Sequence, residues 1–434
     1  MNDWNTDDLV AADKRYLWHP FTSMHDWCAP DHEPLVLVEG HGAVLRDSRG
    51  REYIDGNSSI WTNIHGHNHP HINAAIRRQL ERVAHTSFLG FTNPPAIELA
   101  RAIVKLFPAN TLNRVFYSDD GSTGMEVALR IADQYWRLRG SGRDRFIAFK
   151  NAYHGDTAGA ASLGAAAMFR EGVSNWNFPA LQISSMTELE ALPAEEASQI
   201  AAVVIEPMVQ GAAGIQLWPA GTLTGVRNWC DRSGALLMAD EVLTGFGRTG
   251  KMFACQHENV FPDIMILAKA LTGGYLPLAI TLLTEQIFSA FAASSEAEST
   301  LYYGHSYTGN ALACATANAS LEIFEKENVL EALVGKIAAL RSELASVREL
   351  RWVESVAAVR IDCGSGIANG SRRKTWSRRV PGRAQPRTPN ETDPQRDRLD
   401  ATFLHHALAV APGRSSHRVR DRRGLWRKRA CQKW

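Results

Sequence analysis

Three ionisable side chains stand at the ends of apolar runs in the middle of the chain. Glu206, Asp240 and Lys269 each end a run of about five residues without polar alternation. Such runs are typical of strands buried on both faces of a parallel sheet, and ligands of these sheets bind outside the carboxyl ends of the strands. We therefore expect two carboxylates and an amine to meet in one pocket, although each alone could be a solvated charge at a strand end.

The order of these groups points to pyridoxal phosphate chemistry. A lysine amine at the end of a buried run is partly desolvated, which lowers its pKa and makes it a nucleophile for a carbonyl group. Asp240 precedes Lys269 by 29 residues. Pyridoxal phosphate needs such a pair, a lysine for its aldehyde and a carboxylate for its pyridinium nitrogen. The segment from Ser118 to Gly124 (SDDGSTG) opens a predicted helix, whose N-terminal amides and hydroxyls suit a phosphate.

The elements that must position these residues alternate along the chain. Residues 35–55 carry short apolar runs separated by glycines, which predicts a β-meander. From about residue 70, buried strands alternate with helices, which favours an α/β fold with a mostly parallel sheet. Apolar residues at helical spacing predict helices over residues 72–83, 96–107, 122–138, 312–325 and 329–347.

Seven segments resemble a known family. They are Tyr16–Thr22 (YLWHPFT), Asp55–Pro70 (DGNSSIWTNIHGHNHP), Tyr117–Ser122 (YSDDGS), Tyr153–Thr157 (YHGDT), Asp240–Ala254 (DEVLTGFGRTGKMFA), Lys269, and Gly304–Asn310 (GHSYTGN). With them, residues 15–325 resemble the class III, fold type I pyridoxal-phosphate aminotransferases. The resemblance implies a large cofactor-binding domain with a mostly parallel sheet and a smaller α/β domain.

The resemblance also implies roles for individual residues. Lys269 would form a Schiff base with pyridoxal 5'-phosphate and later move the substrate proton. Asp240 would pair with the pyridinium nitrogen, and Tyr153 would stack on the cofactor ring and face the substrate. Gly121 and Ser122 would hold the phosphate.

Further roles concern the substrate and a partner subunit. Ile60 and Trp61 would line an apolar substrate channel, which segments with Arg248 and Asp156 border. The enzyme would be a homodimer in which Gly304, His305 and Ser306 reach the site from the partner subunit, with His305 and Ser306 near the cofactor, Ser306 on its phosphate, and Gly304 near the substrate.

The Trp-His-Pro opening and the Trp61 segment are typical of family members that convert 8-amino-7-oxononanoate to 7,8-diaminononanoate in biotin synthesis. Phe21 and Ile60 stand where many relatives have a tyrosine and a tryptophan. Relatives with such changes include users of lysine as well as of S-adenosylmethionine, so both amino donors stay open. Another class III omega-aminotransferase is the alternative within the family.

The charge balance divides the chain. Of 47 Lys and Arg residues 18 lie in residues 361–434, against 6 of the 46 Asp and Glu residues. This segment has 10 Leu, Ile, Val, Phe or Met residues among 74, a composition typical of disorder. We expect an N-terminal segment with the meander over 1–65, a large domain over 66–325, the start of the small domain over 326–358, and an Arg-rich tail over 359–434.

The tail has two interpretations. The family ends in a small domain whose Arg-Pro segment grips the substrate carboxylate, whereas Arg378–Pro381 lies in Arg-rich sequence without apolar strands. A frameshift in GC-rich DNA yields such a composition, and the chain would then be an impaired enzyme. A basic arm for nucleic acid is the other interpretation, but the tail has no recognition motif, so we expect no nucleic-acid partner.

Composition excludes several classes. The chain has 434 residues, a formal net charge of +1, and no apolar run near the roughly 18 residues that cross a bilayer. An acidic N-terminus without an apolar core predicts no secretory signal, and hence a cytoplasmic enzyme with reduced, mostly buried thiols. His65, His67, His69 and His71 alternate, but a Gly/Asn/Pro-containing loop without a nearby Cys or carboxylate favours hydrogen bonding over a metal site.

Overall fold

The computed structural model describes residues 4–164 and 178–345 in full. Beyond residue 345 it describes the backbone of five short strands: β13 (Val353–Val359), β14 (Asp362–Ile367), β15 (Leu408–Val410), β16 (Arg418–Arg420) and β17 (Trp426–Lys428). Most of the Arg-rich tail, Arg378–Pro381 included, lies outside the described residues. The chain forms two compact units, one of Met1–Asn57 with Asp397–Trp434 and one of Ser58–Arg396.

The first unit contains the expected meander. Strands β1 (Leu37–His41), β2 (Val44–Asp47) and β3 (Glu52–Asp55) pair antiparallel in chain order, and β15 adds to the free edge of β3. Two helices precede them, α1 (Thr6–Tyr16) and α2 (Met24–Trp27).

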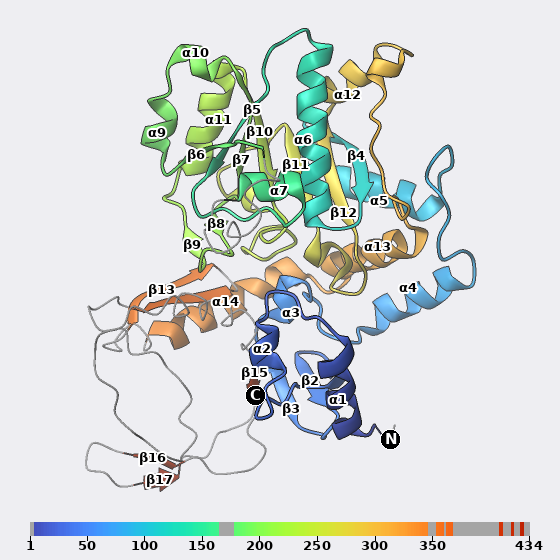
Figure 1. Ribbon diagram of the computed structural model, residues 1–434, viewed down its shortest axis with the longest axis vertical. Coiled ribbons are helices and arrows are strands. Elements are labelled where there is room, and N and C mark those ends of the chain that lie inside the picture. Colours follow the sequence, from blue (N-terminus) through green and yellow to red (C-terminus); the bar gives the residue numbers. More distant parts are fainter. Residues whose placement is uncertain are drawn as a thin grey trace. The chain divides into compact units, whose positions relative to one another are not determined.

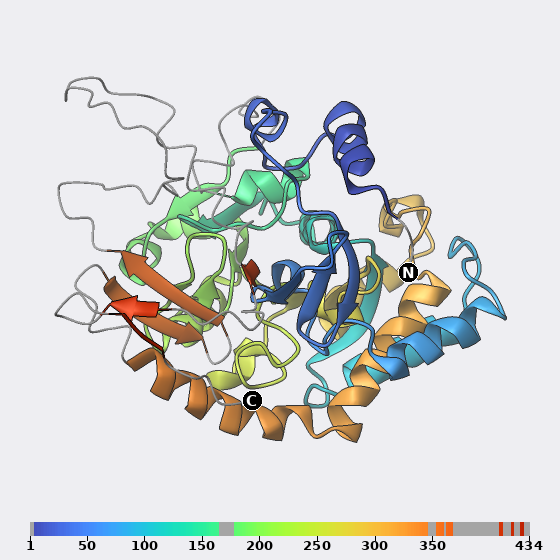
Figure 2. The ribbon, with the colours of Figure 1, turned by 90° about the horizontal axis from the view of Figure 1, so that it is seen from below.

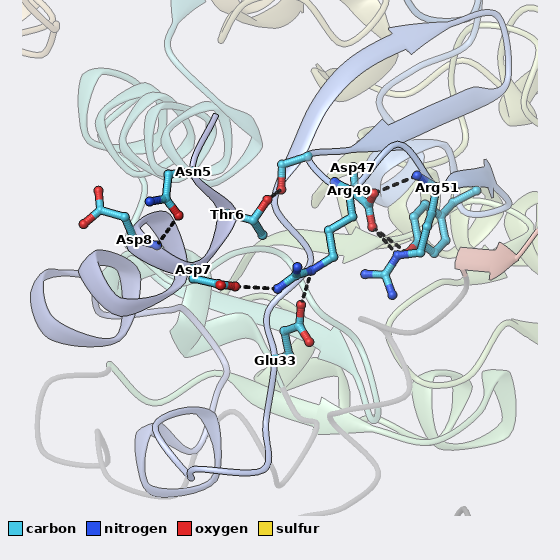
Figure 3. A network of polar contacts seen from close by, with 10 residues as sticks. Asn5, Thr6, Asp7, Asp8, Glu33, Asp47, Arg49 and Arg51 are labelled. Atoms are coloured by element: carbon cyan, nitrogen blue, oxygen red, sulfur yellow. Dashed lines mark hydrogen bonds and ion pairs between the residues drawn. The ribbon is translucent and has the colours of Figure 1, made fainter. Parts of the chain in front are cut away.

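A polar network links α1 to the meander (Figure 3). The Arg49 guanidinium contacts Asp7 of α1 at 2.8 Å and Glu33 at 2.6 Å. At the adjoining turn, the buried Asp47 accepts hydrogen bonds from Arg51 Nε at 2.7 Å and from the Tyr53 hydroxyl at 2.8 Å. Burial disfavours the Asp47 carboxylate, but these bonds outweigh it and lower its pKa. Since the Arg49 pairs are exposed, Asp47 fixes this turn more firmly than they do.

The histidine of the Trp-His-Pro opening has a structural role within this unit. The His19 Nε2 atom lies 2.9 Å from Asp13 Oδ2, and its ring lies 4.0 Å from the Trp27 ring. The other Asp13 oxygen accepts from Trp27 Nε1 at 2.7 Å. These contacts join α1 to α2.

The second unit is built on a seven-stranded sheet (Figure 1). Its strand order is β4-β12-β11-β10-β7-β5-β6. Strands β11, β10, β7 and β5 are parallel, as the apolar runs predict, and the short strand β6 is parallel to β5, whereas β12 is antiparallel to both neighbours. The bounds are β4 (Leu112–Ser118), β5 (Arg145–Phe149), β6 (Leu181–Ile183), β7 (Ile200–Ile205), β10 (Leu236–Asp240), β11 (Ile264–Leu267) and β12 (Ala279–Thr284).

Helices cover both faces of this sheet. Alternate residues of one strand enter different cores: Ala202 and Val204 pack with α6 (Gly121–Leu138), while Val203 and Ile205 pack with residues of α5, α11 and α13. Alternation between two apolar environments explains why the strands are apolar without interruption. The other helices are α4 (Pro70–Leu80), α5 (Pro94–Val104), α7 (Ala158–Leu163), α9 (Met186–Glu190), α10 (Ala194–Ala197), α11 (Thr222–Ser233), α12 (Glu285–Ala292), α13 (Ala311–Lys326) and α14 (Val329–Ala345).

The predicted helices are confirmed to within a few residues at each end. Figure 2 shows the last two, α13 and α14, following one another along one side of this unit. In the part of the chain that the structure describes, no helix is long and apolar enough to cross a membrane.

The four alternating histidines make hydrogen bonds, as expected of this loop. His65 bonds to Ser320 at 3.1 Å, His67 to Asn63 at 2.8 Å, His69 to Glu327 at 3.1 Å and His71 to Glu322 at 2.8 Å. Three of these contacts fasten the segment from His65 to His71, which includes the start of α4, to α13 and to the residue that follows it, Glu327. Among the four cysteines whose side chains are described, Cys230, Cys255 and Cys314 are buried and Cys28 is exposed.

Candidate active site

A cavity of about 740 Å³ opens at the carboxyl ends of the parallel strands in the second unit. Glu206, Asp240 and Lys269 all line it, so the three strand-end residues do meet in one place. Each stands at the carboxyl end of a different strand, β7, β10 and β11 respectively, and these strands are neighbours in the sheet. The alternative of three separate solvated charges is wrong.

Lys269 lies where β11 ends and a 3-10 turn, η2 (Lys269–Thr272), begins. Burial lowers the pKa of its amine; the carboxylates of Asp240 and Glu206 oppose this shift, and the Arg248 guanidinium adds to it. The amine lies 4.8 Å from the centroid of the Trp61 ring, close enough for a cation–π contact. A lysine with a lowered pKa is suited to attack a carbonyl carbon.

Asp240 is held by two hydrogen bonds at the end of β10. Its Oδ2 atom lies 2.7 Å from His154 Nδ1, and its Oδ1 atom accepts from the Val242 amide at 3.1 Å. His154 is fully enclosed; burial disfavours its charged form, but Asp240 and Glu206 outweigh burial and raise the pKa of the imidazole. This arrangement fixes the carboxylate at the cavity wall.

Glu206 is buried and joins two loops. Its two carboxylate oxygens accept from the amides of Tyr153 at 3.1 Å and Gly211 at 2.9 Å. Burial raises the pKa of this carboxyl group to about 7; His154 opposes the shift and Asp240 adds to it.

Tyr153 lines the same cavity with a fixed ring. Its hydroxyl donates to Asp156 Oδ2 at 2.6 Å, while Glu206 holds its backbone amide. Burial, followed by the Asp156 carboxylate, raises the pKa of the phenol, so it stays protonated at neutral pH.

The N-terminus of α6 faces the cavity. Asp120 caps this 18-residue helix by accepting from the Thr123 amide at 2.9 Å, which leaves the amides of Gly121 and Ser122 outside the helix's own bonding. Ser122 Oγ accepts from the amides of Asp156 and Thr157 at 2.9 and 3.0 Å. A Cβ atom on Gly121 would lie 2.8 Å from a methyl carbon of Val242, so only glycine lets the helix start this close to the β10 end.

Trp61 reaches the cavity through an unusual turn. Four consecutive non-glycine residues, Ser58 to Trp61, have φ angles between 50° and 63°, a conformation that costs about 1–2 kcal/mol per residue. The buried Arg248 donates from Nη2 to the Trp61 carbonyl oxygen at 3.0 Å and helps to hold the turn. Arg248 thus borders the cavity through Trp61, whereas Asp156 lines it directly.

Four expected site residues are not among those that line the cavity of this chain. Ile60 is 42% exposed, although its neighbour Trp61 is in the cavity wall. Gly304, His305 and Ser306, expected to act on a partner's site, lie on a loop of the same unit. There the His305 Nδ1 atom lies 3.2 Å from Asp119 Oδ2, and Asp119 does line the cavity.

Sequence reasoning missed two contributors. His154 follows Tyr153 in a segment already singled out, but nothing in the sequence shows that it pairs with Asp240, 86 positions away. Thr157, whose hydroxyl lies 2.9 Å from Ser122 Oγ, belongs to the same segment. A run of polar residues after a buried strand was the available signal.

Comparison with known proteins identifies the family. The family described as "Aminotransferase class-III" matches residues 28–368. The chain belongs to the class III aminotransferases. Its fold is fold type I, it is a pyridoxal-phosphate-dependent enzyme, and the family match ends where the Arg-rich composition begins.

Named relatives are similar over most of their length. This aminotransferase is 46% identical over 381 residues to adenosylmethionine-8-amino-7-oxononanoate aminotransferase of Nitratidesulfovibrio vulgaris, covering 83% of this chain and 70% of the relative. The protein of that name from Geobacter sulfurreducens is 44% identical over 377 residues, covering 82% of this chain and 83% of the relative.

Solved structures agree in fold. The structure of adenosylmethionine-8-amino-7-oxononanoate aminotransferase from Methanocaldococcus jannaschii has a TM-score of 0.81 and 39% identity, covering 84% of this chain and 85% of that one. An (S)-enantioselective omega-transaminase from Thermomicrobium roseum has a TM-score of 0.78 and 31% identity, covering 85% and 86%.

The cavity of this aminotransferase suits pyridoxal phosphate. It brings together an amine with a lowered pKa, a fixed carboxylate and a helix N-terminus with spare amides. The glycine at that N-terminus lets the helix start against Val242, where a Cβ atom would lie 2.8 Å from a methyl carbon. These are the groups that the aldehyde, the pyridinium nitrogen and the phosphate each require.

Proposed function

We propose that this aminotransferase converts 8-amino-7-oxononanoate to 7,8-diaminononanoate in biotin biosynthesis, with S-adenosylmethionine or lysine as the amino donor. The proposal is carried by the relatives of that name, which are 38–46% identical over 73–86% of this chain. The apolar contacts of Trp61 with Val209 and Leu243 support it, because an acceptor with a long aliphatic chain needs such a wall.

The proposed roles follow from the contacts in the cavity. Pyridoxal phosphate, when bound, supplies an electron sink for the substrate carbon. Lys269 Nζ would take a proton from the donor carbon in one half-reaction and would supply a proton to the acceptor carbon that receives the amino group in the other. Asp240, fixed by His154, keeps the pyridine nitrogen protonated, and Tyr153 covers the ring. Gly121 and Ser122 bind the phosphate through their amides.

Trp61 supports the reaction by excluding water from Lys269. Its ring lies against the amine. Burial lowers the pKa of the amine, so more of it is unprotonated and able to take a proton from carbon. Its place beside Val209 and Leu243 also gives the acceptor chain an apolar surface.

We also propose a homodimer with Gly304, His305 and Ser306 completing the partner's site. Tyr302 and Tyr307, which flank this loop, are 74% and 61% exposed, and the His85 ring lies 4.7 Å from Tyr307. Large exposed aromatic side chains are typical of interfaces. Sedimentation of the cofactor-loaded protein at micromolar concentration should give a dimer, and a monomer under those conditions contradicts this proposal.

Another class III omega-transaminase activity is the second candidate, favoured by the likeness to the Thermomicrobium roseum enzyme. The test is a steady-state assay of purified protein with pyridoxal phosphate. One series pairs 8-amino-7-oxononanoate with S-adenosylmethionine or lysine, and a second pairs simple ω-amines with pyruvate. Formation of 7,8-diaminononanoate, and growth of a biotin auxotroph lacking this step, support the first candidate. Turnover only in the second series supports the other.

An impaired chain is the third outcome, because the tail, which lies mostly outside the described residues, contains no Arg-Pro segment between apolar strands that could bind the acceptor carboxylate. In that case pyridoxal phosphate binds but neither series turns over at a useful rate.

A further inference from the structure

Glu206 occupies the middle of three adjacent strand ends. Its strand β7 lies between β5, which leads to Tyr153, and β10, which ends at Asp240. The side chain is only 6% exposed. A buried carboxylate is costly unless its oxygens accept hydrogen bonds, and here each oxygen has a backbone amide as its donor, Tyr153 for one and Gly211 for the other.

The two donors belong to different walls of the cavity. Tyr153 stands on the loop after β5. Gly211 follows a short hairpin strand, β8 (Val209–Gln210), which pairs with β9 (Gln216–Leu217). The backbone carbonyl of Glu206 accepts from Trp218 Nε1 at 3.0 Å, so the far end of the hairpin is also fastened to this residue.

Gly211 sits tightly against the apolar side of the cavity. A Cβ atom there would clash with a methyl carbon of Leu243 and lie 3.7 Å from Trp61 Cη2. Val209 and Leu243 form a small buried cluster with Trp61 packed against it. A shift of Gly211 would therefore move the surface that faces Lys269.

We propose that Glu206 is a positioning residue that sets the width of the slot between Tyr153 and the apolar wall of Gly211, Leu243 and Trp61. The inference rests on the proposed function for the identity of the acceptor. The cofactor, pyridoxal phosphate, follows from the family instead. Both walls depend on one carboxylate, and the geometry requires two acceptor atoms because two N–H donors point at it.

This requirement makes Glu206→Gln a sharp test. Glutamine has the same shape but one acceptor oxygen, so its NH₂ group would face one of the two backbone donors. We expect the Kd for pyridoxal phosphate, measured by fluorescence on the apoprotein, to rise about tenfold, the effect of losing one hydrogen bond to a charged group. The KM for 8-amino-7-oxononanoate should rise by a similar factor, with kcat changed by less than about threefold.

Glu258→Gln is the matched control. Glu258 likewise accepts from two backbone amides, Gly221 at 3.1 Å and Thr224 at 2.8 Å, but it does not line the cavity. It should lower the melting temperature without changing either constant by more than twofold. Far-UV circular dichroism of both variants checks that they fold.

The pH dependence of the Kd for pyridoxal phosphate is a second readout. The pKa of the Glu206 carboxyl is raised to about 7, and His154, Asp240 and Lys269 are the charged groups that face it. Protonation turns one acceptor oxygen into a hydroxyl, so the Kd for pyridoxal phosphate should rise as the pH falls through about 7 in the wild type. In Glu206→Gln the Kd for pyridoxal phosphate should already be high at neutral pH. It should also lack the part of the pH dependence that comes from Glu206.

The results separate the two proposals. A wild type that binds pyridoxal phosphate but ignores 8-amino-7-oxononanoate contradicts the proposed substrate and leaves the cofactor measurements to decide on Glu206. Kd and KM values within twofold of wild type in Glu206→Gln overturn the positioning role. So does an equal change in Glu258→Gln, which would make the effect one of general stability.

Discussion

His154 Nδ1 lies 2.7 Å from Asp240 Oδ2, with both side chains enclosed by the protein. The hydrogen bond joins a residue after β5 to the end of β10, across the strand that carries Glu206. Because Asp240 must remain a carboxylate in a buried place, a donor at this position stabilises it by about 1.5–3 kcal/mol.

Two substitutions of His154 should separate this bond from simple packing. The Nδ2 atom of asparagine can take the place of imidazole Nδ1, whereas the longer glutamine side chain places its amide near the position of Nε2. His154→Asn should keep the Kd for pyridoxal phosphate within about threefold, and His154→Gln should raise it about tenfold or more. Absorbance titration of the apoprotein measures both, and equal affinities in the two variants would contradict the role of the bond.

Gly121 should tolerate no side chain. In Gly121→Ala the new methyl group would lie 2.8 Å from Val242 Cγ1, and overpacking of this kind costs about 1–3 kcal/mol. We expect weaker binding of pyridoxal phosphate and a lower melting temperature. Val242→Ala in the same chain should restore both, and Gly142→Ala, where the structure leaves open space, should change neither. Failure of the double variant to recover would show that the clash is not the cause.

Lys269→Met should abolish the visible absorption band of bound pyridoxal phosphate and all transamination, because no other amine among the described cavity residues is placed to replace it. Lys251→Met, a change at an exposed lysine, is the control and should have neither effect. A retained band in Lys269→Met would refute the assignment.

The same residue makes a prediction for stability. Burial lowers the pKa of Lys269 in the folded apoprotein, so the unfolded chain binds its proton more tightly. The free energy of unfolding should therefore rise with pH between the folded pKa and about 10.5. Denaturant unfolding of apoprotein at several pH values should show this rise in the wild type relative to Lys269→Met. Parallel curves would contradict the lowered pKa.

The tail predicts a defect in acceptor turnover. If residues after about 358 are out of frame, a chain restored to the frame that encodes an Arg-Pro segment between apolar strands should bind the acceptor carboxylate bidentately. Its kcat/KM for 8-amino-7-oxononanoate should exceed that of the present chain by about one to two decades. Steady-state kinetics on both chains and complementation of a biotin auxotroph measure this. Equal kcat/KM would show that the Arg-rich tail is a legitimate part of the enzyme.

Individual strands and helices could be predicted from the local sequence where their apolar pattern is specific to one kind of element. The strand preceding Asp240 and the helix after Asp120 could be predicted because apolar residues repeat at the spacing of those elements. The antiparallel strand β12 could not, because its burial on both faces gives it the same apolar pattern as its parallel neighbours. The left-handed turn from Ser58 to Trp61 was equally hidden, since none of its residues favours positive φ.

The sequence by itself determined which groups the site contains. Asp240 and Lys269 stand at the carboxyl ends of buried strands, and parallel strands bring these ends to one edge of the sheet, so their meeting follows from the pattern alone. Only the tertiary structure decided how these groups are held. The contacts of His154 with Asp240, Glu206 with Gly211 and Arg248 with Trp61 depend on strand order and loop paths. Packing of distant segments sets those paths, and no local spacing records it.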